Sequence, residues 1–506
     1  MPLPREGAAW PPDNEGRQAS TLREHAAWYS GDPAKLATFY QPRTGVNARP
    51  AQLSGGVVGM LARWWWGTPA AVGETDAKLH VPLAADIAGT SADLLFSESI
   101  SLSGAKDPVS LFLSGLQDDG LDAKLHEAAE VGAALGGVYL RTTWDESLSP
   151  RPWTTIIHPD GACPEFRAGR LVAVNLWTQL KGDGKTVFRH IERHESGAII
   201  HQLYAGSADN IGKVVPLESH PDTAYLAKLV DANSAQPTGA KRLTVAYVPN
   251  MLPNRLERHS PMGRSDFQGV TPLFDALDEA YSSWWRDIRH GKSRLHVPAQ
   301  YLEADGPGQA AIADTDRELY VPLRGVLAKS DDGLLIQAQQ FAIRVAEHRD
   351  TCEAWTQRAI ESAGYSTQSL ASDSGGAQTA TEVHAHERRS YMTRGKKERY
   401  WTAGLRDHLG AMIEVANANL KANLGADSTV AVSFPDGVQP APLELANVAL
   451  ALKNAEAAST EVRVRMVHPD WTDDKVTAEV DAIHRETAAP VMDPTLAPGL
   501  PGDAGL

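Results

Sequence analysis

Hydrophobic positions early in the chain recur every three to four residues, the spacing of one face of a helix. Leu83, Ile87 and Leu94 follow this spacing. A second such stretch continues to Leu135, where two glycines follow and favour the end of a helix. The pattern predicts a mainly helical segment over residues 20–136.

The pattern changes to that of β-strands after residue 137. β-Branched and aromatic residues dominate the runs VYLRTTW, WTTIIH, LVAVNLWTQL, TVFRHIERH and AIIHQLY. Turn-forming clusters separate these runs at Pro159–Asp160–Gly161, Gly182–Asp183–Gly184 and Glu195–Ser196–Gly197, and such clusters are typical of hairpin connections. We therefore expect an antiparallel β unit over residues 137–270.

Two helices that bracket further strands are expected next. Thr271 and Pro272 suit the start of the first helix, which has one apolar stripe: Leu273, Leu277, Ala280, Trp284 and Ile288. Strand-like runs occupy residues 295–346, and Gly364 ends a second helix over residues 347–364. Cations crowd the end of the first helix, where positive charge suits the helix dipole: Arg286, Arg289, Lys292 and Arg294.

The longest helical pattern runs over residues 380–425 and spans about 65–70 Å if it is continuous. A helix of that length needs neighbours along its sides. The strand-like run STVAVSF and short helical patterns up to residue 488 complete the ordered chain. Residues 489–506 are rich in Pro, Gly and Ala and are expected to be disordered, and residues 1–19 are expected to form a flexible arm. The order of elements predicts an α+β, multi-domain protein.

Composition narrows the possible functions. The chain has 506 residues and a formal net charge of −15, so on average it repels DNA. Its two cysteines, Cys163 and Cys352, lie far apart in sequence and are expected to be reduced thiols. No run of about 18 apolar residues occurs, so no membrane span is expected.

The candidate chemical motifs favour structural roles. Gly184–Lys185–Thr186 looks like the end of a phosphate-binding loop, but Gln179 stands where that loop needs glycine, so we expect a hairpin turn. His190 and His194 lie on a strand about 13 Å apart, with His201 near, and surface histidines are expected rather than a zinc site. No catalytic, cofactor-binding or metal-ligating residue is predicted.

Three further segments have two interpretations each. Trp64–Trp65–Trp66 favours packing or a subunit interface, the alternative being a stacking platform for single-stranded nucleic acid. The basic cluster over residues 388–399 is typical of a solvated helix face, the alternative being a contact with a neighbouring acidic subunit or with DNA phosphates. No Lys or Arg lies between Arg358 and Arg388. That absence suits a plain surface loop, and equally a surface past which DNA slides.

At this point the order of segments resembles a known family, the portal (head–tail connector) proteins of tailed bacteriophages, in particular long-tailed phages of actinobacteria. The resemblance lies in HVPLAADIAGTSADLLFSE, GRSDFQGVTPLFDALDEAYSSWWRDIRHGKSRLHVP, FAIRVAEHRDTCEAWTQRAIESAGYSTQSL and VSFPDGVQPAPLELANVALALKNAEAASTEVRVRMVHPDW. These four segments follow the order of the family and span most of residues 20–490.

The resemblance implies a division of the chain into named parts. In order along the chain they are a flexible arm (1–19), a helical wing (20–136), a β-rich wing (137–270), stem helix 1 (271–294), an α/β clip (295–346), stem helix 2 (347–364), a tunnel loop (365–379), a long wing helix (380–425), a helical crown (426–488) and a disordered tail (489–506).

The resemblance also implies a function. Portal subunits form a ring, expected to be a dodecamer, at one capsid vertex of the virion, and double-stranded DNA is packaged and ejected through its channel. The implied partners are the terminase large subunit, the head–tail adaptor, and the major capsid and scaffolding proteins, with assembly in the host cytoplasm. The implied tunnel-loop residues that face DNA are Ser366, Gln368, Ser369, Ser372, Asp373, Ser374, Gly375, Gly376 and Gln378. The cations Arg286, Arg289, Lys292 and Arg294 would line the channel or pair within the stem.

Two other functions remain open from the sequence alone. The first is another virion component, such as a minor capsid or baseplate protein. The second is a hydrolase with an unrecognised site in the β unit. Neither alternative predicts a ring whose subunits bracket a clip between two stem helices.

Overall fold

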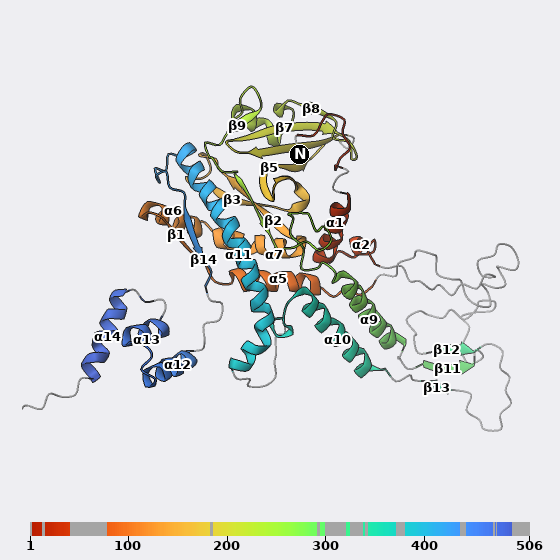
Figure 1. Ribbon diagram of the computed structural model, residues 1–506. Coiled ribbons are helices and arrows are strands. Elements are labelled where there is room, and N and C mark those ends of the chain that lie inside the picture. The colour runs from red at the N-terminus through yellow and green to blue at the C-terminus, as the bar shows by residue number, and fades with distance from the viewer. Residues whose placement is uncertain are drawn as a thin grey trace, which may run out of the picture. The chain divides into compact units, whose positions relative to one another are not determined.

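The computed structural model of the chain (Figure 1) combines helices and sheets, which confirms the α+β class. It describes residues 3–12, 16–40, 78–182, 186–290, 294–298, 320–323, 337–339, 343–370, 380–435, 442–468, 471 and 473–487. The chain forms two compact units, residues 1–376 with 385–435 and residues 377–384 with 436–506.

A layer of helices forms the first part of the larger unit. Among the described residues, its helices are α1 (Gly16–Ser30), α2 (Pro33–Leu36), α5 (Leu83–Phe96), α6 (Asp107–Asp118) and α7 (Leu121–Leu135). Ile87, Leu113 and Leu125 have no exposed surface and pack in one core with residues of the later helices. α7 ends at Gly136, whose φ of 92° is the left-handed conformation that glycine adopts at a helix C-terminus.

Two antiparallel sheets follow, as the strand pattern predicts. In the smaller sheet, β2 (Gly137–Thr143) lies between β10 (Val245–Pro249) and β3 (Trp153–Ile157). The larger sheet has the order β4-β5-β6-β7-β8, and β9 pairs with β7. Its strands are β4 (Ala162–Arg167), β5 (Arg170–Leu180), β6 (Val187–Glu195), β7 (Ala198–Gly206), β8 (Lys213–Val215) and β9 (Ala235–Pro237). The short helix α8 (Pro221–Ala224) lies between β8 and β9 in the chain.

Two of the three predicted hairpin connections are confirmed. β5 pairs with β6, and β6 pairs with β7 through the turn at Gly197, which has a φ of 87°. The prediction for Pro159–Asp160–Gly161 is wrong: these residues form a 3₁₀ turn, η2, between β3 and β4. Because β3 and β4 belong to different sheets, the turn carries the chain from one sheet to the other.

Three long helices, a small sheet and one further pair of strands complete the described residues of this part of the chain. α9 (Thr271–His290) and α10 (Val345–Ala363) bracket a small sheet in which β11 (Arg294–Pro298) pairs parallel with β12 (Tyr320–Leu323) and antiparallel with β13 (Gln337–Gln339). α11 (Ala380–Asn419) has 40 residues and confirms the long helix. β14 (Val430–Ser433) pairs antiparallel with β1 (Ser101–Gly104), a short strand that the sequence pattern did not indicate.

The smaller unit is helical. It contains α12 (Pro442–Asn454), α13 (Thr460–Val467) and α14 (Asp473–Thr487), as predicted. The Ser459 side chain accepts a hydrogen bond from the Val462 backbone N–H and caps α13.

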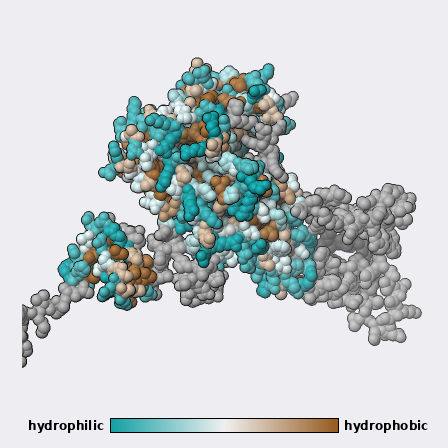
Figure 2. Space-filling view, viewed as in Figure 1, coloured by the Kyte–Doolittle hydropathy of each residue, from teal (hydrophilic) through white to brown (hydrophobic). Residues whose placement is uncertain are grey.

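Figure 2 shows that hydrophilic residues cover most of the visible face of the larger unit. Among the helices that the structure describes, none has the length and apolar character needed to cross a membrane.

The N-terminal residues differ from the flexible arm expected for residues 1–19. Residues 3–12 lie against the six-stranded sheet, where the Gly7 N–H donates to the Gly212 carbonyl over 2.8 Å. Trp10 is 5% exposed and packs edge-on against Trp177, with ring centroids 5.4 Å apart. The apolar face of β5–β7 needs a cover, and this segment supplies it.

The expectation of surface histidines on β6 and β7 is also wrong. His190, His194 and His201 are at most 7% exposed. They lie on the sheet face from which the Glu192 side chain reaches Arg141 of β2. That face is therefore covered by the smaller sheet.

The packing of Trp10 predicts a loss of stability when this side chain is removed. Trp10→Ala should lower the free energy of unfolding of the β-rich region by about 3–5 kcal/mol, because it opens a cavity over Trp177. Hydrogen exchange of the β5–β7 amides measures that free energy. The exposed Arg5 is the control, and Arg5→Ala should change it by less than about 0.5 kcal/mol. Equal, small effects of both substitutions would show a free arm.

Two further buried histidines should make the folded protein less stable in acid. Burial lowers the pKa of His408 to about 3 and that of His25 to about 4. Because the folded protein holds both neutral, their stabilisation is complete above about pH 6.5 and is lost as the pH falls toward 4, by about 1.4 kcal/mol per pH unit for each group. His408 contacts the Thr154 hydroxyl at 2.8 Å.

Denaturant unfolding at pH 7 and pH 5 tests this expectation. His408→Gln can keep a hydrogen bond to Thr154 and removes the titrating group, so the stability difference between the two pH values should shrink by about 2 kcal/mol. As a control, Trp10→Ala removes no titrating group and should leave the difference between the two pH values unchanged. An undiminished difference in His408→Gln would contradict the assignment.

Candidate functional site

Helices α9 and α10 lie side by side (Figure 1), and their contacts show an antiparallel pair. Asp287, near the end of α9, accepts hydrogen bonds from His348 at 2.8 Å and Arg344 at 3.0 Å, at the start of α10. The His348 ring stacks on Trp284 with an interplanar angle of 4°. Hydrogen bonds from His348 and Arg344 hold the pKa of Asp287 below its usual range. The two helices thus form a hairpin, called here the stem pair.

The middle of α9 is fixed by one buried carboxylate. Asp278 is 1% exposed and lies in the middle of the helix. Its carboxylate accepts hydrogen bonds from the Tyr40 hydroxyl and the Val81 backbone N–H, each at 2.9 Å, and contacts the His80 ring at the same distance. The Asp278 charge therefore joins α9 to two segments that lie about 200 residues earlier.

A second buried group lies where the stem pair meets the helical core. The Lys397 ammonium of α11 donates to the Asp266 carboxylate at 2.6 Å, and both side chains are 2% exposed. Lys397 also donates to Ser91 at 2.6 Å and to Tyr365 at 2.9 Å. Asp266 in turn accepts from Tyr365 at 2.7 Å and from Asn250 at 2.8 Å. These five residues are called the junction cluster.

Within the junction cluster, burial acts against the charge of Lys397, and the neighbouring polar groups compensate for it. Burial lowers the pKa of Lys397, and the adjacent Asp266 opposes that shift. Burial and the Asp266 charge raise the pKa of Tyr365 well above its usual value, so Tyr365 stays protonated and can donate. A buried ion pair is tolerated when hydrogen bonds satisfy the remaining polar atoms, and this one has three such partners.

The start of the predicted tunnel loop is anchored rather than free. Ser366 is 8% exposed, and its backbone N–H donates to the Ser390 hydroxyl at 2.8 Å. Ser369 shares a 2.8 Å hydrogen bond with the same hydroxyl, and Gln368 lies in the short helix η6 (Thr367–Ser369). Ser366 is therefore unsuited to contact DNA, because its side chain is buried. The remaining predicted loop residues lie outside the described part: Ser372, Asp373, Ser374, Gly375, Gly376 and Gln378.

Among the predicted stem cations, the structure describes the side chain of Arg286 and not those of Arg289, Lys292 and Arg294. Arg286 pairs with Glu279 of the same helix at 2.7 Å. Arg289 lies in α9, whereas Arg294 lies in β11, so the helix ends before it. Lys292, like Lys185 and all of Trp64–Trp65–Trp66, lies outside the described residues.

The basic cluster over residues 388–399 is divided by burial. Lys397 is enclosed by the junction cluster, and Arg394 is 8% exposed and pairs with Glu398 at 3.0 Å. The interpretation as a solvated face paired with acids is therefore wrong about the exposure of these two residues, although Arg394 does pair with an acid. Lys396 and Arg399 are exposed. Periodicity alone missed the difference, because the partner of Lys397 lies 131 residues earlier.

Removing the Lys397 charge should destabilise the larger unit strongly. Lys397→Met leaves the Asp266 charge buried without its cation, so the free energy of unfolding should fall by about 3–5 kcal/mol. Lys396→Met removes an exposed charge one residue away and should change it by less than about 0.5 kcal/mol. Adding Asp266→Asn to Lys397→Met should restore part of the loss. Equal effects of the two lysine substitutions in denaturant unfolding would contradict the role of the ion pair.

Comparison with known proteins places this fold in a family. A solved structure described as the neck of a native GTA particle computed with C12 symmetry aligns with a TM-score of 0.39 and 12% identity, over 85% of this chain and 97% of that chain. No curated protein matches the sequence. The family described as phage portal protein, SPP1 Gp6-like, matches residues 70–490. The match covers most of the chain, including every part of the stem pair and the junction cluster, and the chain therefore belongs to the phage portal protein family.

Proposed function

We propose that this chain assembles into a closed ring, expected to be a dodecamer, at one vertex of a phage capsid. The ring encloses a channel through which double-stranded DNA is packaged and later ejected. Family membership supports this proposal, and it disfavours a minor capsid or baseplate component and a hydrolase. The proposed role is structural, with the energy for packaging supplied by a separate ATPase.

The observation that carries the proposal is the apolar surface of the stem pair. Trp285 is 54% exposed and Ile288 is 39% exposed on α9. On α10, Val345 is 50% exposed and Trp355 is 37% exposed. Exposed aromatic and aliphatic side chains on a structured hairpin are typical of a surface that another protein covers. In a ring, the neighbouring copy is that protein.

The parts named from the family order are assigned to elements of the structure. α9 is the first stem helix, the β11–β13 sheet belongs to the clip, and α10 is the second stem helix. Two boundaries move: α10 begins at Val345, and the crown begins after Pro435 because β14 pairs with β1 of the wing. The sheets of residues 137–249 belong to the β-rich wing and α11 to the long wing helix.

Charge supports a channel that does not hold DNA. The chain carries a net charge of −15, and no Lys or Arg occurs from residue 359 to residue 387. Each phosphate–cation contact adds to the affinity of a protein for DNA, so a loop without cations grips the backbone weakly. We therefore assign residues 365–379 to the channel wall, apart from the buried Tyr365 and Ser366.

The proposed partners follow from the ring. The clip docks the terminase large subunit during packaging and the head–tail adaptor afterwards. The outer parts of the ring contact the major capsid and scaffolding proteins during assembly in the host cytoplasm, and the finished ring stays in the virion. DNA passes through without sequence-specific contacts.

Native mass spectrometry of the purified chain tests the ring. The wild type should give closed assemblies of about twelve copies. Trp285→Glu places a charge in each proposed interface, so it should raise the protein concentration needed for assembly at least about 30-fold, the equivalent of 2 kcal/mol.

The control for Trp285→Glu is a similarly exposed aromatic residue outside the stem pair. Tyr225 is 59% exposed, and Tyr225→Glu should leave assembly unchanged. A wild-type chain that stays monomeric or dimeric at all concentrations would contradict the ring. A Trp285→Glu variant that assembles like the wild type would contradict this interface.

A further inference from the structure

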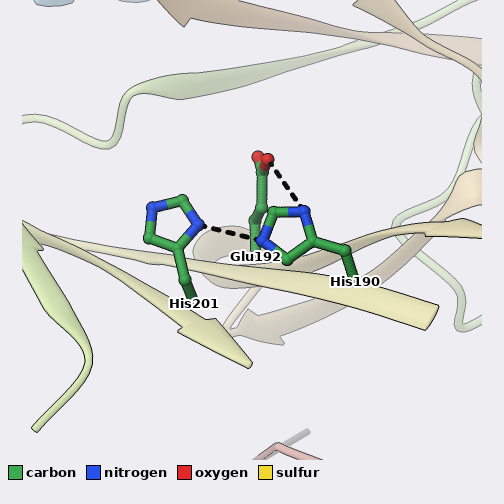
Figure 3. A group of neighbouring side chains, drawn as sticks. All are labelled: His190, Glu192 and His201. Carbon is green, nitrogen blue, oxygen red and sulfur yellow. Dashed lines mark hydrogen bonds and ion pairs between the residues drawn. The ribbon is translucent and has the colours of Figure 1, made fainter. Parts of the chain in front are cut away.

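Two imidazoles and a carboxylate meet on one face of the six-stranded sheet. Figure 3 shows His190 and Glu192 on β6 and His201 on the neighbouring strand, with the Glu192 carboxylate rising between the two rings. The strand register explains the meeting, because Glu192 is the cross-strand partner of His201 and His190 lies two residues before Glu192. One possible ligand atom from each side chain lies within 4.8 Å of those of the other two.

We propose that His190, Glu192 and His201 bind one Zn²⁺ ion. Two neutral imidazoles and one carboxylate are a donor set that Zn²⁺ uses with a fourth position left for water. Bonds of about 2.0–2.2 Å in tetrahedral geometry place ligand atoms about 3.4 Å apart. The His190 Nε2 to His201 Nδ1 distance is 3.2 Å, and the His190 Nδ1 to Glu192 Oε1 distance is 3.7 Å.

Those two distances use different nitrogens of His190. A change in the His190 side-chain torsions would bring one nitrogen toward both other ligands, whose atoms lie within 4.8 Å of those of His190. This change moves a side chain and leaves the backbone in place, because β6 and β7 are already paired along their full length. The ion would then join β6 to β7 through side chains as well as through the backbone.

The surrounding residues hold the three ligands in orientation. Arg141 donates to Glu192 Oε2 at 2.7 Å, and His194 contacts the same oxygen at 3.3 Å. Glu192 Oε1 is thereby left facing His190. Gln236 Oε1 lies 3.2 Å from His201 Nε2, which leaves Nδ1 of His201 for the ion. Partners of this kind commonly fix the tautomer and the ring orientation of metal ligands.

A cavity supplies access and room for a water ligand. It has a volume of about 370 Å³, and Glu192 and His201 line it together with Arg141 and Asp145. A proposed metal site needs a route for the ion and space for its open coordination position, and this cavity reaches Glu192 and His201, two of the three proposed ligands. The cavity is the observation, independent of the ligand distances, that points to an occupant.

The alternative is a chain of hydrogen bonds without an ion. In it His201 donates from Nδ1 to His190 Nε2, and His190 donates from Nδ1 toward Glu192. A neutral His201 then presents the lone pair of Nε2 to Gln236, so the Gln236 amide must turn over and donate its NH₂ to that nitrogen. The two states differ in whether Zn²⁺ displaces the shared protons. A measurement of ion binding separates them directly.

The test is Zn²⁺ titration of the full-length protein after removal of metals with a chelator. One Zn²⁺ per chain should bind, and Co²⁺ in its place should give the visible absorption of a tetrahedral site. Glu192→Gln and His201→Gln should each weaken Zn²⁺ binding at least about 100-fold. Gln236→Ala, which removes only a supporting contact, should weaken it about 10-fold.

The control is the exposed histidine–carboxylate pair of His126 and Asp93, in which the ring lies 2.9 Å from the carboxylate. His126→Gln should leave Zn²⁺ binding unchanged. Because a buried substitution can unfold the sheet, the Co²⁺ spectrum of the unaltered protein serves as a second measurement. Absence of a stoichiometric ion in the wild type, or binding that survives Glu192→Gln and His201→Gln, would overturn the proposal.

Discussion

The buried ion pair between Lys397 and Asp266 is the constraint on which the larger unit depends. An isolated charge in a protein interior costs several kcal/mol, so neither residue is tolerated there without the other. Their hydrogen-bonded partners come from α5, from the end of β10 and from the segment after α10. The cluster is therefore complete only when helices, sheet and stem pair have all packed. The buried Asp278 carboxylate holds the middle of α9 in the same way, through hydrogen bonds to distant segments.

The stem pair and the strands with the buried histidines are two different regions of the subunit. The stem pair is anchored through buried charges, and its exposed side chains include Trp285 and Trp355. A rigid hairpin with apolar side chains loses little conformational entropy when a neighbour covers it. The strands that carry His190, Glu192 and His201 belong to a different region, where the proposed ion would add stiffness to one hairpin of the β-rich wing.

Local sequence patterns predicted the helices and strands, whereas contacts between residues far apart in sequence determine which of their side chains are buried. The stripe of Leu83 and Ile87 predicts α5, and Gly136 and Gly364 mark helix ends, because these signals lie within one or two turns. Burial of Lys397 and His201 was missed, since each depends on residues far away in sequence. The histidine spacing was interpreted along one strand, and the cross-strand pairing that brings His201 beside Glu192 had no local signal. The packed N-terminal segment was missed for the same reason, because its proline and polar residues are typical of a free arm.

A cryo-electron microscopy reconstruction of the purified full-length chain tests the central claim most directly, namely that this portal-family subunit forms a ring whose stem pairs meet side by side. The account predicts closed rings with a central channel, in which the exposed face of α9 and α10 is covered by the next subunit. Particles without a closed ring, or rings in which Trp285 and Trp355 remain exposed to solvent, would contradict it.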